Sequence, residues 1–130
     1  MYYYDHDSVE PSEMLGKTMK SVVQHTGNHG DQLTFTTTEG QVYVFVHIQD
    51  CCENVRVEDI TGDLDDLVGS PLLQSEGVTS SDTNKPDDWS ESWTWTFYKF
   101  ATNKGYVTVR WLGESNGYYS ESVDLFRLKK

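Results

Sequence analysis

Apolar and polar positions alternate along most of this chain, and the alternation predicts strands rather than helices. Residues 19–26, 32–38 and 41–48 are rich in β-branched and aromatic side chains with a period of two. The stretch 41–48 has this character throughout, which is typical of a central strand. Gly-containing turns at 27–31 and 39–40 separate the three segments. The first third of the chain therefore predicts consecutive antiparallel strands.

The second half of the chain continues this pattern. We expect a short strand at 55–60, one helical turn at 63–68, a hairpin at 93–113 and a last strand at 118–128. The stretch 79–92 is polar and acidic and predicts a long surface loop. The fold class is mainly β, a β-rich α+β domain with an antiparallel sheet of six or seven strands and one or two short helices.

Two sets of alternate positions stand out in the predicted hairpin: Trp93, Trp95 and Phe97 in its first strand, and Val107, Val109 and Trp111 in its second. Each set shares one face of a strand, so we expect most of these side chains in the core. Residues 1–13 are polar with an aromatic tip, which predicts an N-terminal tail. Residues 14–130 are then a single domain, consistent with a total length of 130 residues.

Charge narrows the classes of partner. Asp and Glu number 21 against 10 Lys and Arg, which gives a net charge of −11. This charge opposes direct binding to nucleic acid but suits a basic groove on a protein partner. No apolar run is long enough for a membrane span, and the N-terminus lacks the basic and apolar regions of a signal peptide. We expect a cytoplasmic monomer.

The segment HIQDCCE (47–53) carries the strongest chemical signal. A predicted central strand delivers His47 and then turns into Cys51 and Cys52. Imidazole and thiolate are ligands that zinc prefers, so these three residues are candidate metal ligands. Both thiols reach one metal only if the backbone is kinked there. The fourth ligand is open: His25, His29, Glu53 and Glu76 are candidates, and Glu76 completes our predicted set.

Three other interpretations of the same segment remain. The cysteines and His47 also suit an ordinary core, because free cysteines pack as small apolar groups. A catalytic thiolate is opposed by Asp50 and Glu53, whose charges raise the pKa of a neighbouring thiol. A disulfide between the adjacent cysteines would be strained.

The acidic loop supplies the candidate partner-binding residues. They are Asp82, Asp87, Asp88, Trp89 and Glu91. Carboxylates steer association with a basic surface, and tryptophan is common among the residues that dominate binding energy. The alternative is a solvated face that keeps the protein in solution.

Two motifs resemble a known family. They are His47-x-Gln49-Asp50-Cys51-Cys52-Glu53, followed by GDLxDLxG at 62–69, and Arg110-Trp111-x-Gly113-x-Ser115-Asn116-Gly117-Tyr118-Tyr119-Ser120. Together they are similar to a family of small phage and prophage proteins that carries a domain of unknown function, over roughly residues 14 to 128.

The resemblance implies a phage-encoded protein that works inside a bacterial host cell. It looks like an anti-CRISPR protein that inhibits a Cas9-type effector nuclease, a host defence protein with basic channels. In this interpretation zinc is structural and the protein is not an enzyme. The alternative is a zinc-dependent hydrolase, in which Glu53 or Glu76 acts as general base toward a metal-activated water.

Overall fold

Eleven short elements make up the described part of the chain, which comprises residues 6–27, 30–49, 52–80, 91–117 and 119–128 of a computed structural model. The strands are β1 (His6–Ser8), β2 (Met19–His25), β3 (Gln32–Thr37), β4 (Val42–Val46), β5 (Asn54–Thr61), β6 (Gln74–Ser80), β7 (Ser92–Thr102), β8 (Gly105–Ser115) and β9 (Asp124–Leu128). The 3-10 turns are η1 (Pro11–Met14) and η2 (Leu64–Leu67). No helix among these residues has the length and apolar character needed to cross a membrane.

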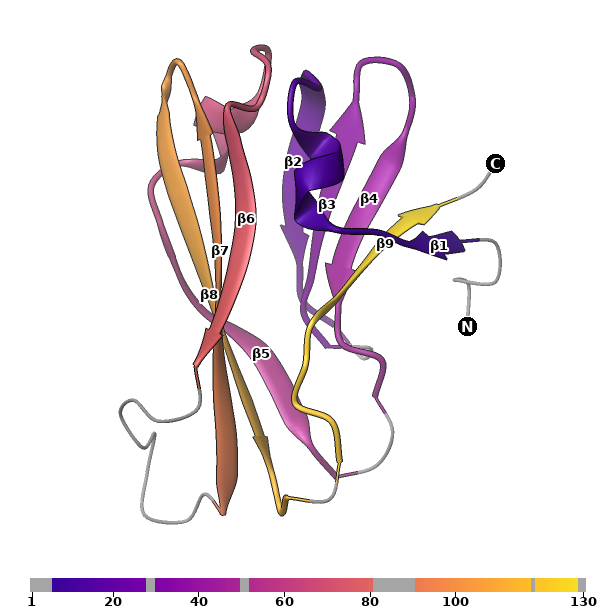
Figure 1. The fold of residues 1–130 in the computed structure, drawn as a ribbon, viewed down its shortest axis with the longest axis vertical. Coiled ribbons are helices and arrows are strands. Elements are labelled where there is room, and N and C mark those ends of the chain that lie inside the picture. The colour runs from indigo at the N-terminus through magenta and orange to yellow at the C-terminus, as the bar shows by residue number, and fades with distance from the viewer. Residues whose placement is uncertain (1–5, 28–29, 50–51, 81–90, 118, 129–130) are drawn as a thin grey trace.

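The strands form two antiparallel sheets packed face to face (Figure 1). One sheet has the order β1-β9-β4-β3-β2, and the other has the order β5-β8-β7-β6. The prediction of a mainly β, antiparallel fold is confirmed. The described residues form nine strands in two sheets, more than the six or seven expected. The predicted last strand begins only at Asp124, because the residues before it cross the end of the sandwich.

Aromatic rings from both sheets meet in the core. Phe35 and Phe45 of the five-stranded sheet contact Phe100 and Tyr98 of the other, with ring centroids 4.9 Å and 4.6 Å apart. Beside them Trp111 is fully buried. These tilted ring pairs fill the space between the sheets and add specific geometry to apolar burial. The core therefore fixes which face of β7 and β8 points inward.

One of the two predicted core sets lies on the other face. Tyr98 and Phe100 point inward, so Trp93, Trp95 and Phe97 alternate to the outer face of β7. Trp95 is nevertheless only 7% exposed, and the Arg110 guanidinium lies 4.7 Å from its ring centroid. The alternation correctly places the three aromatic residues on one face of β7. It does not predict which face of the strand packs against the second sheet.

Residues 6–13 belong to the folded domain and are not a free tail, which corrects the predicted boundary. β1 pairs with β9, so the first described residues complete the five-stranded sheet. Arg127 on β9 donates to Asp7 at 3.0 Å and to Glu13 at 2.6 Å. The Tyr43 hydroxyl also donates to Glu13, at 2.9 Å. Strand pairing and these polar contacts help to hold this segment, and an apolar period does not reveal such contacts.

The Tyr43 contact predicts a loss of stability at high pH. Burial and the neighbouring Glu13 raise the pKa of Tyr43 to about 12, above the usual value of about 10. Between these values the unfolded chain releases the phenol proton while the folded chain retains it, so stability falls as the pH rises. We expect Tyr43→Phe to lose less stability than the wild type between about pH 9 and about pH 11.5.

Urea unfolding followed by tryptophan fluorescence measures this difference. Tyr106→Phe is the matched control, because Tyr106 is 77% exposed. The control should follow the wild type over the whole pH range. Equal losses in the wild type and Tyr43→Phe would contradict the expectation.

Candidate functional site

The first sequence motif connects the two sheets. His47 directly follows β4, and Glu53 directly precedes β5, so residues 47–53 form a crossover. His47 Nε2 lies 2.7 Å from Glu53 Oε2, and the two side chains are 4% and 0% exposed. On the other side of the ring, His47 Nδ1 donates to the Ser122 carbonyl at 2.8 Å. His47 and Glu53 thus form a buried clamp that joins the end of β4, the start of β5 and Ser122.

A second carboxyl group lies near this clamp. Asp124 is the first residue of β9 and stands opposite Val46 in the ladder. Burial raises the pKa of Asp124 above its usual range, and the charge of His47 partly opposes that rise. His47 therefore interacts electrostatically with a carboxyl group on each sheet.

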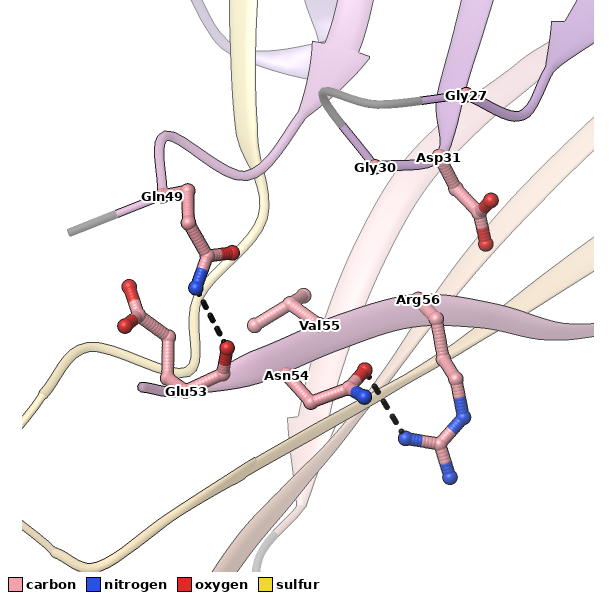
Figure 2. Close-up of a pocket in the computed structure, with 8 residues that line it drawn as sticks. All are labelled: Gly27, Gly30, Asp31, Gln49, Glu53, Asn54, Val55 and Arg56. Atoms are coloured by element: carbon pink, nitrogen blue, oxygen red, sulfur yellow. Dashed lines mark hydrogen bonds between the residues drawn. The ribbon is translucent and has the colours of Figure 1, made fainter. Parts of the chain in front are cut away.

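Gln49 forms a hydrogen bond inside the crossover loop. Its side-chain amide donates to the Glu53 carbonyl at 2.6 Å, as Figure 2 shows. Cys52, near the end of the loop, is disulfide-bonded. Cys51, the one other cysteine of the sequence, lies outside the described residues, as does Asp50.

The described donors do not form a zinc site in this arrangement. Both ring nitrogens of His47 are engaged, and a disulfide-bonded Cys52 offers no thiolate. Glu76 accepts from Gln74 on β6, at the edge of the four-stranded sheet opposite β5. Over the described residues no group of three His, Cys, Asp or Glu side chains is placed to hold a metal ion. Zinc and the zinc hydrolase stay predictions of the sequence.

The same contacts bear on acid–base chemistry. A catalytic histidine needs one ring nitrogen available to a reactant or a nucleophile. His47 instead directs one nitrogen at a backbone carbonyl and the other at a buried carboxylate. These two contacts stabilise the crossover and occupy both ring nitrogens of His47.

The second motif brings the chain back across the end of β8. Gly113 lies against Glu121: a Cβ at Gly113 would stand 2.4 Å from the Glu121 carbonyl oxygen. The Glu121 carboxylate accepts from Thr94 Oγ1 at 2.7 Å and from Ser115 Oγ at 2.5 Å. Ser122 directly follows Glu121, and its backbone carbonyl accepts the hydrogen bond from His47 Nδ1. The two motifs therefore meet at one end of the sandwich.

Sequence reasoning did not identify Glu121, Ser122 or Asp124. None belongs to the quoted motifs, and Ser122 acts through its backbone carbonyl, which has no side-chain signature. The available signal was Gly113, because a glycine within a strand often marks the close approach of another backbone.

A polar pocket lies beside the crossover. Figure 2 shows it between the β2–β3 turn and the start of β5, with a volume of about 320 Å³. Its charged side chains are already engaged: Asp31 accepts from the Val57 backbone at 2.7 Å, and Arg56 donates to Glu114 at 2.7 Å. The hydrogen bond from Val57 on β5 to Asp31 before β3 links the two sheets beside this pocket.

The predicted partner-binding residues are only partly described. Asp82, Asp87, Asp88 and Trp89 lie outside the described residues. Glu91 is exposed just before β7. The structure thus places one member of this set at the surface, and the others stay predictions.

Comparison with known proteins identifies the family. No curated protein and no solved structure matches this chain. One family profile matches residues 12–125, a range that contains both motifs and the His47–Glu53 clamp. The chain belongs to the family described as Domain of unknown function (DUF7448).

Proposed function

We propose that this protein is a phage-encoded inhibitor of a bacterial defence nuclease of the Cas9 type. In this proposal it docks through an acidic surface on a basic channel of the nuclease and blocks nucleic-acid loading or activation. It acts as a binding protein and performs no chemistry on its target. The acidic loop, with Asp82, Asp87, Asp88, Trp89 and Glu91, is its proposed contact surface.

The pairing of the arginines supports this proposal. All three arginines of the sequence bind carboxylates: Arg56 pairs with Glu58 and Glu114, Arg110 with Asp59, and Arg127 with Asp7 and Glu13. Each arginine charge is thus compensated by a carboxylate of the same chain, and the net charge of the chain is −11. Such a surface is repelled by nucleic acid and attracted to the basic surfaces that bind it.

DNA cleavage by a guide-loaded Cas9-type nuclease tests the proposal. We expect micromolar protein to inhibit cleavage, and inhibition to weaken as NaCl is raised from about 50 to about 300 mM. Neutralising the loop with Asp82→Asn, Asp87→Asn, Asp88→Asn and Glu91→Gln should weaken inhibition at least about tenfold, because charged contacts contribute strongly to steered association.

A matched control separates the loop from the overall charge. The variant Glu10→Gln, Glu39→Gln, Asp65→Asn and Glu76→Gln removes the same number of charges from exposed positions elsewhere. It should inhibit nearly as well as the wild type. If both variants weaken equally, the loop is not the contact surface. If wild-type protein leaves DNA binding and cleavage unchanged, the proposed function is wrong.

A further inference from the structure

A second pocket lies at the end of the sandwich where the two motifs meet. It is formed by β6, β7, Gly117 and residues 119–122, and its volume is about 380 Å³. Most of the residues that line it carry a hydroxyl, among them Thr94, Ser120 and Ser122, and Tyr119 adds an aromatic ring. Among the described residues, Glu121 is the one charged residue that lines it. The pocket is therefore rich in hydrogen-bond acceptors and carries a negative charge.

The Glu121 carboxylate is held in place without being neutralised. Thr94 and Ser115 donate one hydrogen bond each to its two oxygens. No ion pair to Glu121 is formed by any Lys, Arg or His among the described residues. A carboxylate has about four acceptor sites, so hydrogen bonds from the described residues leave about two. Glu121 is thus a fixed anion with room for further donors.

We propose that this pocket binds the guanidinium group of an arginine side chain. A guanidinium presents a planar fork of donors that matches a carboxylate and also stacks on aromatic rings. The hydroxyls of Ser120 and Ser122, 2.7 Å apart, offer further acceptors on the same wall. The net charge of −11 favours a cationic ligand over a neutral polyol.

The identification of a basic partner protein as the source of this arginine rests on the proposed function. The pocket itself does not depend on that partner. Free blocked arginine therefore tests the site separately from any nuclease. Its neutral isostere, blocked citrulline, keeps the shape and most of the donors but lacks the charge.

Two-dimensional NMR of the full chain measures the binding of N-acetylarginine amide. We expect shifts that cluster on Thr94 and residues 119–122, and an affinity at least about tenfold higher than for N-acetylcitrulline amide, because charged hydrogen bonds are about twice as strong. Glu121→Gln should lower the affinity for arginine by at least about tenfold. It should keep the fold, since hydroxyls donate to or accept from an amide equally well.

Glu39→Gln is the matched control, because it removes one charge from the β3–β4 turn at the other end of the molecule (Figure 1). It should bind arginine like the wild type. Equal binding of arginine and citrulline would overturn the inference and favour a neutral ligand such as a saccharide. Shifts elsewhere, or undiminished binding by Glu121→Gln, would overturn it as well. If Glu121→Gln does not fold, the comparison of arginine with citrulline on the wild type still decides.

The two proposals fail in different ways. Nuclease inhibition without arginine binding overturns the pocket and leaves the proposed function intact. Arginine binding at Glu121 without nuclease inhibition upholds the pocket and overturns the proposed function.

Discussion

Replacing Glu53 with alanine is expected to lower the free energy of unfolding by about 3–5 kcal/mol, because it leaves the buried His47 without its partner. Glu53 is fully buried at the side chain, and His47 is 4% exposed. When either side chain is removed, the one that remains is still buried and is not hydrated. For a domain of this size such a loss corresponds to a fall of at least about 10 °C in Tm.

Calorimetry or urea unfolding measures this cost, and the chain offers a matched control. Glu58 also forms an ion pair, with Arg56, but the two side chains are 36% and 35% exposed. Glu58→Ala should therefore cost no more than about 1 kcal/mol. A cost for Glu53→Ala no larger than that of Glu58→Ala would contradict the buried clamp.

The double variant His47→Leu with Glu53→Leu tests the mechanism of the loss. When both members of a buried pair are replaced by apolar residues, no unpaired charge remains. We expect the double variant to be less destabilised than the sum of the two single variants. If the losses simply add, the two side chains do not interact.

The second large effect is expected at Gly113. An alanine Cβ there would stand 2.4 Å from the Glu121 carbonyl oxygen and 2.8 Å from the Glu121 Cβ. Both atoms belong to a segment held by hydrogen bonds to Thr94 and Ser115, so it must shift as a unit. Such overpacking costs about 1–3 kcal/mol. We expect Gly113→Ala to reach this range and to loosen residues 119–123.

Hydrogen exchange over residues 119–123, together with urea unfolding, measures both parts of the effect. Gly27→Ala is the control, because a Cβ at Gly27 meets nothing within 4 Å. The control should leave stability and exchange close to those of the wild type. Unchanged exchange in Gly113→Ala would show that the segment does not pack on the strand as described.

Local secondary structure was the part of the fold that could be predicted from the sequence. Each segment with alternating apolar positions contains a strand, although the last begins only at Asp124, and the turn expected at 63–68 contains η2. The division into two sheets was not predictable, since the same alternation serves one sheet or two. The structural role of His47 was not predictable for a similar reason. Its chemistry marked it as a candidate, but its contact with Ser122 joins residues 75 positions apart. No local pattern encodes that approach.

The position of β9 bears on how the domain folds. In chain order it is the last strand, yet it lies between β1 and β4 in the five-stranded sheet. β1 therefore has no neighbour in the sheet until Asp124–Leu128 has been synthesised. In this sheet β2, β3 and β4 pair in chain order, as β6, β7 and β8 do in the four-stranded sheet. Local pairing of this kind forms faster than pairing across most of the chain. During synthesis these two sets of consecutive strands are thus able to pair before β9 is complete, and the N-terminal strand joins the domain last.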